Sequence, residues 1–273
     1  TVVDYLWMKR GKIMDFYGFY TGKIFDAHKY LGAHINRGKN GKAQGVVFRT
    51  FAPSASRISV IGEFNGWTES PMKKVHDGNF WEFISEEAEP GMMYKYRIYD
   101  RAGHWIDHCD PYGYGMELRP NTASNIRDMD AYQFQDDKWM KKRSDHKELP
   151  LNIYELHFGS FKKPSDEPDA WYDYEEMADI LIPYLKENGY NYLEIMPLSE
   201  YPCDESWGYQ GTGFFSPTSR YGTADQLKAF VDACHKNEIG IILDFVPVHF
   251  AVDDYALANY DGTALYEYCL LYT

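Results

Sequence analysis

The sequence predicts a multidomain protein in which an all-β, immunoglobulin-like sandwich is followed by the first three β/α units of a TIM (β/α)8 barrel. Residues 44–130 hold short apolar runs separated by turn residues, a spacing that is typical of an antiparallel β-sandwich. From residue 151 on, three apolar strands alternate with connections that contain helices, as in right-handed βαβ units. The sequence ends after the third of these strands, so the predicted barrel is incomplete.

The predicted sandwich depends on four strands. Each is rich in β-branched and aromatic residues, and pairs such as Asn65-Gly66, Asp77-Gly78 and Pro90-Gly91 form turns between them. The predicted strands are 46–51, 57–61, 80–84 and 94–99. In the third strand Trp81 alternates with Phe83, which predicts that Trp81 is a core residue.

Changes in polarity set the remaining domain limits. Residues 1–43 form a mixed helical and irregular lead-in, in which 24–31 favours a helix that ends at Gly32. Residues 131–150 are polar and charged and are predicted to connect the two domains. The N-terminal part of the barrel therefore covers residues 151–273.

The barrel segment contains three short strands and two capped helices. The predicted strands are 152–158, 192–197 and 240–245. Asp173 is suited to be the N-cap of the first helix, and the second begins at Thr223, whose capping box is completed by Gln226. An open, doubly wound sheet would place a phosphate-binding glycine loop after its first strand. This sequence has no such loop there, so a barrel is favoured.

Charge and composition exclude several kinds of partner. The 41 acidic residues exceed the 28 Lys and Arg residues and give a net charge of −13, which argues against nucleic-acid binding. No apolar stretch comes near the roughly 18 residues of a membrane span, so no membrane partner is expected. Aromatic residues make up 17% of the chain, and such an excess of rings favours a neutral sugar as the ligand.

The spacing of cysteine and histidine predicts neither disulfides nor a metal site. The four cysteines are far apart and follow no C-x-x-C pattern, which indicates reduced thiols in the cytoplasm. His104, His108 and Cys109 lie close together in the sequence, but no second group of ligands accompanies them. We therefore expect no metal and no cofactor.

Four residues are candidates for a binding site because of their position. Asp244 ends the third barrel strand and His249 follows one loop turn later, and α/β barrels place their chemistry at the carboxyl ends of strands. The alternative is an aspartate that caps a turn and a histidine at the surface. Trp67 follows a turn of the sandwich, and both it and Trp105 are either platforms for a sugar or core residues.

Motifs in both predicted domains resemble those of glucan-active enzymes. Four segments of the sandwich resemble the starch- and glycogen-binding module of branching and debranching enzymes, carbohydrate-binding module family 48. These segments are 51–55, 62–67, 103–112 and 124–125. Segments 154–160, 206–210 and 243–250 resemble the first barrel strand, the stacking loop and the first conserved region of glucan branching enzymes. These enzymes belong to the α-amylase superfamily, glycoside hydrolase family 13, and the resemblance covers nearly the whole chain.

The resemblance implies a role for six residues. Tyr209 would stack under the sugar at the cleaved bond, Asp244 would hold an arginine and sugar hydroxyls, and His249 would bind the 6-hydroxyl. The glucan contacts that it implies in the sandwich are Trp67, Trp105 and Asn125. The nucleophile and the acid/base carboxylate of the family lie on strands beyond the third, so no catalytic residue is expected in this chain.

The resemblance implies the N-terminal part of a 1,4-α-glucan branching enzyme, a retaining glycosyltransferase. Such an enzyme cuts an α-1,4 linkage and transfers the segment to a 6-hydroxyl, which makes an α-1,6 branch in glycogen synthesis. The chain begins at Thr1 rather than Met, and we expect a fragment that binds α-glucan (glycogen or amylose) without catalysis. Two alternatives remain open: an α-amylase-type hydrolase or debranching enzyme, and a non-catalytic carbohydrate-binding protein.

Overall fold

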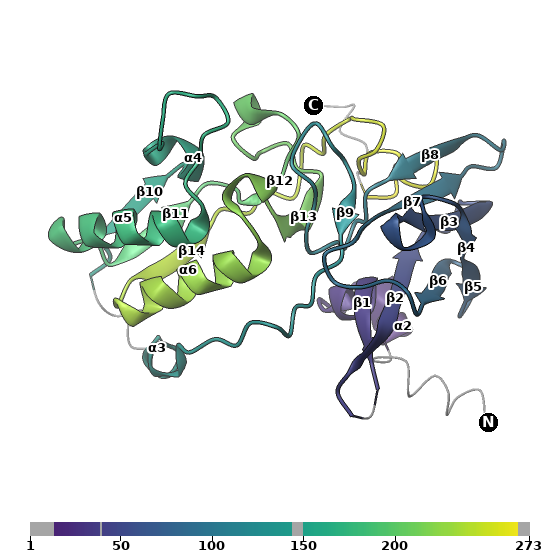
Figure 1. Cartoon of the computed structure of the whole chain (residues 1–273), viewed down its shortest axis with the longest axis horizontal. Helices are drawn as coiled ribbons and strands as arrows, with labels where there is room; N and C mark the ends of the chain where they lie inside the picture. The colour runs from purple at the N-terminus through teal and green to yellow at the C-terminus, as the bar shows by residue number, and fades with distance from the viewer. Residues whose placement is uncertain (1–13, 39, 144–149, 267–273) are drawn as a thin grey trace. The chain divides into compact units, whose positions relative to one another are not determined.

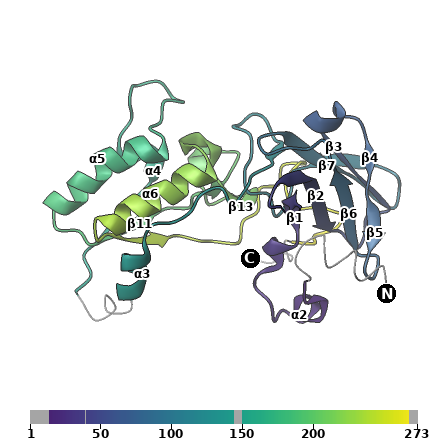
Figure 2. The same ribbon diagram turned by 60° about the horizontal axis from the view of Figure 1, so that its bottom comes forward.

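The chain forms two compact units in the computed structural model shown in Figures 1 and 2. The described residues are 14–38, 40–143 and 150–266. Within them, the first unit consists of the residues up to 128, 212–216 and 250–266. The second unit consists of 129–211 and 217–249. Within the described ranges, every helix is too short or too polar to cross a membrane.

Two antiparallel sheets form the first unit. One sheet has the order β1 (Gly32–Arg37), β2 (Ala43–Phe51), β6 (Phe80–Ser85) and β5 (Lys73–Val75). The other has the order β4 (Ser70–Pro71), β3 (Arg57–Gly62), β7 (Met93–Tyr99) and β8 (Trp105–His108), and β9 (Ser124–Asn125) also pairs with β7. The remaining elements of this unit are α2 (Phe16–Tyr20), the 3-10 turns η1 (Ala27–Lys29) and η2 (Glu63–Asn65), and most of β13 (Gly213–Pro217).

Strand alternation builds the core of this sandwich. Along β7, Tyr94, Tyr96 and Ile98 are buried, whereas the residues between them are partly exposed. Trp81 is buried as predicted, and its indole N–H donates to the carbonyl oxygen of Ala52 at 3.0 Å. The four predicted sandwich strands are therefore confirmed as β2, β3, β6 and β7.

The N-terminal region differs from the predicted lead-in. The expected helix over 24–31 is reduced to the single turn η1, and β1 follows directly. β1 pairs with β2, with Gly32 opposite Arg49 and Ala33 opposite Phe48. Because Leu31 and Ala33 are buried in this packing, tertiary contacts override the weak helix propensity of the segment.

Two segments that the sequence assigns to the barrel pack within the first unit. Leu257 and Tyr260 belong to the sandwich core, and the Tyr260 hydroxyl lies 2.7 Å from Thr50 Oγ1. The backbone N–H of Ser54 donates to Asp261 Oδ2 at 2.8 Å. The two units are defined by contacts within the structure. The domain limits 44–130 and 151–273 inferred from the sequence remain a prediction.

A three-stranded parallel sheet and two helices make up most of the second unit. The strand order is β10 (Ile153–Leu156), β11 (Tyr192–Ile195) and β14 (Gly240–Leu243). Helix α5 (Tyr174–Glu187) follows β10 and α6 (Ala224–Lys236) follows β11, and the two helices lie side by side (Figures 1 and 2). Among the described residues the sheet does not close, which confirms the predicted incomplete barrel.

Local side-chain capping sets the start of both helices. Asp173 and Glu176 form a reciprocal capping box at the start of α5, and Thr223 and Gln226 do so at the start of α6. The apolar faces of the helices cover the sheet and form one core with it. This core includes Met177, Leu181, Leu185, Leu193, Ile195, Phe230 and Cys234. Shorter elements of the unit are α3 (Asp137–Lys142), α4 (Phe158–Phe161), β12 (Ser199–Glu200), η4 (Asp204–Ser206) and η5 (Ser219–Tyr221).

The segment predicted as a connector packs on α6 over its described part. The Tyr132 hydroxyl donates to Asp232 Oδ2 at 2.8 Å, and Trp139 of α3 stacks on His235 with 4.9 Å between ring centroids. Asp232 is almost fully buried, and its carboxylate accepts hydrogen bonds from the Tyr132 hydroxyl and the Gln135 N–H of this segment. Residues 144–149 of the predicted connector lie outside the described residues.

Candidate functional site

The loop after β12 holds Tyr209 close to the carboxyl end of β14. The turn η4 ends at Trp207, which has a φ of 55° in the left-handed region, and the N–H of Tyr209 donates to the carbonyl oxygen of Ser206 at 3.0 Å. The Ser206 hydroxyl donates to the carbonyl oxygen of Cys203 at 2.7 Å. Local hydrogen bonds therefore define the shape of this loop.

Gly208 lets the loop approach the sheet closely. Its φ is 91°, and a side chain at this position would place Cβ 2.4 Å from the carbonyl oxygen of Pro197. Any larger residue would clash with this backbone oxygen and would also be strained in φ. The loop therefore requires glycine between Trp207 and Tyr209.

Arg220 holds the start of this loop through hydrogen bonds to Asp204. Its side chain is 1% exposed, and its guanidinium donates to Asp204 Oδ1 at 2.6 and 2.8 Å, to Glu200 Oε1 at 3.0 Å and to the Tyr201 carbonyl oxygen at 2.9 Å. The guanidinium also lies 3.8 Å from the centroid of the Tyr201 ring. Since Asp204 begins η4, this buried arginine fixes the loop that carries Tyr209.

The structure brings together Tyr209 and Asp244. The Tyr209 hydroxyl donates to Asp244 Oδ2 at 2.6 Å. This hydrogen bond, partial burial, and the negative charges of Asp244, Glu155 and Glu194 raise the pKa of Tyr209 to about 12. The phenol is therefore a proton donor at neutral pH, and its ring is held in place by the bond.

Carboxylates gather on the sheet face that lies away from the helices. Glu155 of β10 is opposite Glu194 of β11, which is opposite Ile242 of β14. Asp244 follows Ile242 by two residues and so points to the same side. Carboxylates accept hydrogen bonds from hydroxyl groups and repel anions, so this face suits a neutral, hydroxyl-rich ligand better than a phosphate.

His249 lies on the exposed segment that follows β14. Its side chain is exposed and its backbone has a φ of 56°. Within the part of the chain that the structure describes, it makes no hydrogen bond to Tyr209 or Asp244. The structure therefore joins two of the three predicted barrel-site residues, and the role of the third remains a prediction.

Trp67 stands on a turn of the sandwich. Asn65 ties the turn together, because its Oδ1 accepts from the Gly62 N–H at 2.9 Å and its Nδ2 donates to the Val60 carbonyl oxygen at 3.1 Å and to Ser70 Oγ at 2.9 Å. Trp67 has a φ of 61° and is 43% exposed. It is therefore not the core residue that the sequence left open as an alternative.

Trp105 is also exposed, but a cation covers one of its faces. The Arg97 guanidinium lies 4.0 Å from the ring centroid and is fixed by two hydrogen bonds to Asp107, at 2.8 and 2.9 Å. The Trp105 side chain is 50% exposed. Only the face away from Arg97 is therefore free to contact a ligand.

Asn125 is the most buried of the predicted sandwich residues. Its Nδ2 donates to the Gly91 carbonyl oxygen at 2.8 Å, whereas its buried Oδ1 has no partner among the described residues. It pairs with Met93 at one end of β7, and Trp105 pairs with Tyr99 at the other. Trp105 and Asn125 are thus about 20 Å apart along the strand, so a short sugar cannot contact both.

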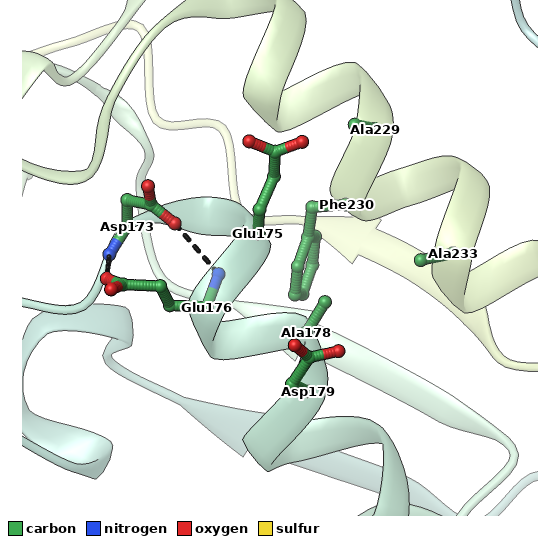
Figure 3. A pocket seen from close by; sticks show the side chains of 8 residues that line it. All are labelled: Asp173, Glu175, Glu176, Ala178, Asp179, Ala229, Phe230 and Ala233. Carbon is green, nitrogen blue, oxygen red and sulfur yellow. Dashed lines mark hydrogen bonds between the residues drawn. The ribbon is translucent and has the colours of Figure 1, made fainter.

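Helices α5 and α6 enclose a surface pocket that contains none of the predicted site residues (Figure 3). Its lining consists of Asp173, Glu175, Glu176, Ala178, Asp179, Ala229, Phe230 and Ala233. Figure 3 shows the two reciprocal hydrogen bonds between Asp173 and Glu176. Asp173 and Glu176 cap the start of α5, and acidic side chains in the first turn of a helix are stabilised by its positive end, so helix formation accounts for the acids of this turn.

The two parts of the chain match two known protein families. Residues 30–113 match Carbohydrate-binding module 48 (Isoamylase N-terminal domain), and residues 160–260 match Alpha amylase, catalytic domain. The first part of the chain is thus similar to a family 48 carbohydrate-binding module, and the second to part of an α-amylase catalytic domain. This composition confirms the resemblance seen in the sequence.

Bacterial branching enzymes are among the curated relatives of this chain. The 1,4-alpha-glucan branching enzyme GlgB of Methylococcus capsulatus is 45% identical over 260 residues, which cover 93% of this chain and 34% of the relative. The GlgB of Dechloromonas aromatica is 45% identical over 259 residues, which cover 92% of this chain and 40% of the relative. The chain therefore spans about a third to two fifths of the length of these relatives.

Solved structures support the same fold. A Salmonella typhimurium protein provisionally named an alpha amylase superposes with a TM-score of 0.67 and 26% identity, over 84% of this chain and 35% of that protein. The pullulanase of Bacillus acidopullulyticus superposes with a TM-score of 0.61 at 21% identity, over 82% of this chain and 31% of that protein, which bears on the fold alone.

Sequence reasoning missed Arg220 and its partners. Glu200 and Asp204 lie 20 and 16 residues before Arg220, and no motif connects the three. Arg220 lies in the turn between the end of β13 and the Thr223 cap of α6, and the residues around it give no sign that it is buried. In the described ranges, no group of three or more His, Cys, Asp or Glu residues is arranged to hold a metal ion.

Proposed function

We propose that this chain is the N-terminal part of a 1,4-α-glucan branching enzyme. The observation that carries the proposal is the 2.6 Å bond between Tyr209 and Asp244, in a segment that matches the α-amylase catalytic domain. An aromatic ring fixed next to a carboxylate can stack on the apolar face of a glucose unit while the carboxylate accepts its hydroxyl groups. His249 is proposed to add a contact to the 6-hydroxyl.

In this proposal the chain binds glucan and other residues of the complete enzyme cleave it. Retaining glycoside chemistry needs two carboxyl groups about 5 to 5.5 Å apart, a nucleophile and an acid/base. We assign neither role in this chain and assign Asp244 to substrate binding. A cytoplasmic location and a part in glycogen synthesis belong to the same proposal, as do glycogen or amylose as the ligand.

The sandwich is proposed to anchor the polymer through its exposed rings. Trp67 and the free face of Trp105 offer stacking surfaces, whereas Asn125 is buried and its Nδ2 is bonded to the Gly91 carbonyl oxygen, so its contact with glucan stays a prediction. Because Trp105 and Asn125 lie at opposite ends of β7, about 20 Å apart, a polymer suits these positions better than a monosaccharide. The match of residues 30–113 to a carbohydrate-binding module supports this assignment.

The reaction is tested on the complete enzyme that contains this chain, with amylose as substrate. Branching lowers the absorbance of the iodine complex without new reducing ends, whereas an α-amylase-type hydrolase or debranching enzyme increases the reducing ends. Tyr209→Phe should retain most activity because the ring remains, whereas Tyr209→Ala should lower kcat/KM by about a hundredfold. Release of reducing ends in proportion to the loss of iodine colour would overturn the proposal.

The chain by itself is tested for binding and turnover. We expect retardation in a gel that contains glycogen and no change in amylose, since binding groups without a nucleophile and an acid do not break bonds. Turnover by the pure chain that is lost in Asp244→Ala would show that the catalytic carboxylates have been wrongly assigned.

A further inference from the structure

Trp207 displays an indole next to Tyr209 on a strained turn. The side chain is 53% exposed, although its backbone φ of 55° lies in a region that bulky residues rarely adopt. Such strain persists only where the surroundings enforce it, and it clusters at binding and active sites. This combination of an exposed ring and an enforced backbone needs an explanation beyond packing.

The ring is supported on one side. The imidazole of His157 lies nearly parallel to it, with 5.9 Å between centroids and 28° between planes. His157 Nδ1 lies 3.0 Å from Ser160 Oγ, while its buried Nε2 has no hydrogen-bond partner among the described residues. The exposed part of the indole therefore lies on the side away from His157.

The loop that carries Trp207 is already ordered. The Arg220 guanidinium holds Asp204 at the start of η4, and Gly208 closes on Pro197 directly after the indole. A ligand that binds here orders few additional groups, so contacts with the ring translate efficiently into affinity. Tyr209 follows two residues later, which limits the distance between the two Cα atoms to about 7 Å.

From these contacts we infer that Trp207 is a second sugar platform, on which the α-glucan bound at Tyr209 stacks another of its glucose units. The inference rests on the proposed function, because it takes the same neutral ligand and continues the same site. The alternative is that Trp207 only covers His157. The two roles differ in whether the indole contacts a bound sugar.

The first test follows each tryptophan of the chain by 19F NMR after labelling with 5-fluorotryptophan. The Trp207 resonance is identified by its loss in Trp207→Gly, a change that keeps the left-handed turn. Titration with maltoheptaose should shift this resonance saturably, while cellohexaose should not, and the buried Trp81 serves as the internal control. A Trp207 resonance that stays still while Trp67 or Trp105 responds overturns the inference and leaves the proposed function intact.

The second test measures affinity with the sandwich rings removed. In a chain with Trp67→Gly and Trp105→Ala, Trp207→Gly should weaken retardation by amylose about tenfold, and Trp207→Phe should weaken it less. If the chain with Trp67→Gly and Trp105→Ala is retarded equally with and without each Trp207 substitution, the inference is overturned. If no resonance moves and the unmodified chain is not retarded by glycogen, the proposed function fails and the inference fails with it.

Discussion

Trp67 in the sandwich and Trp207 in the second unit lie on similar turns, but different side-chain contacts stabilise the two turns. Each indole follows a 3-10 turn, has a left-handed backbone and is about half exposed. The sandwich turn is held by the neutral amide of Asn65, whereas the barrel turn is held by the ion pair of Arg220 with Asp204.

The difference shows two solutions to one requirement. An exposed ring on a left-handed turn needs an anchor, because the backbone conformation is unfavourable for a bulky residue. The amide of Asn65 makes its bonds near the surface at little desolvation cost. Arg220 and Glu200 are both almost fully buried, so each leaves a costly charge if the other is removed. The barrel turn should therefore be the more sensitive of the two to mutation.

The largest effect is expected for Arg220→Ala. The variant leaves Glu200, whose side chain is 5% exposed, without its buried cation and should destabilise the second unit by about 3 to 5 kcal/mol. Hydrogen exchange with mass spectrometry should show the loss first in residues 199–211 and then in the parallel strands. The exchange of the sandwich strands serves as the internal reference.

Arg97→Ala is the matched control for this change. Arg97 also pairs with a carboxylate, that of Asp107, but both side chains are more than a fifth exposed. Its removal should destabilise the first unit by no more than about 1 kcal/mol. Similar losses of stability in Arg97→Ala and Arg220→Ala would contradict the contrast between the two anchors.

The next largest effect on stability is expected from Asp110, which is buried in the first unit and is hydrogen-bonded by neutral groups. Its Oδ2 accepts from the hydroxyls of Tyr94 at 2.7 Å and Tyr96 at 3.0 Å. Burial raises the pKa of Asp110 to about 6, although these bonds and one from the Tyr112 backbone N–H lower it. Between about pH 4 and pH 6 the folded state holds a proton that the unfolded chain has released. Stability from this group therefore falls as the pH rises through this window and is constant above it.

We expect the first unit to lose up to about 3 kcal/mol from Asp110 as the pH rises from 4 to 6.5. The measurement is amide exchange in β7, corrected for the intrinsic pH dependence of exchange. Asp110→Asn, which cannot ionise, should flatten this part of the profile. An unchanged profile in Asp110→Asn would assign the pH dependence to other groups.

A smaller effect is expected for Asn65→Ala. The variant loses three hydrogen bonds of the Trp67 turn and should destabilise the sandwich by about 1 to 2 kcal/mol. Asn65→Asp is the matched control, since it keeps the acceptor for the Gly62 N–H and loses only the two amide donations. Its effect should lie between those of the parent and Asn65→Ala. The observable is amide exchange over residues 62–68.

Local chemistry explains which parts of the fold the sequence could predict. Asp173, Thr223 and Gln226 are helix caps whose partners lie three residues away, so the helix starts are readable in the sequence and are confirmed. Strand β1 was missed, because its formation depends on pairing with β2 and not on its own propensity.

The candidate site divides in the same way. Asp244 was found because it ends an apolar strand, and the resemblance added Tyr209 as its neighbour in function. Their direct hydrogen bond spans 35 residues and follows from the position of the loop on the sheet. Arg220, which fixes that loop, carries no local signal of its burial. The sequence thus indicated Tyr209 and Asp244, whose role in sugar binding stays a prediction, but not the ion pair that positions the loop of Tyr209.

The smallest expected effect returns to the comparison of the two rings. Trp67→Gly removes the indole of the sandwich, and glycine accepts the left-handed backbone without strain. Loss of one stacked ring should weaken binding to glycogen by about 0.5 to 1.5 kcal/mol, measured by affinity electrophoresis of the whole chain. Trp105→Ala should weaken it less, because Arg97 already covers one face of that ring. If Trp67→Gly migrates like the parent while its sandwich amides keep their protection, the turn of Trp67 serves the fold alone. The likeness between the two turns would then carry no functional meaning on the sandwich side.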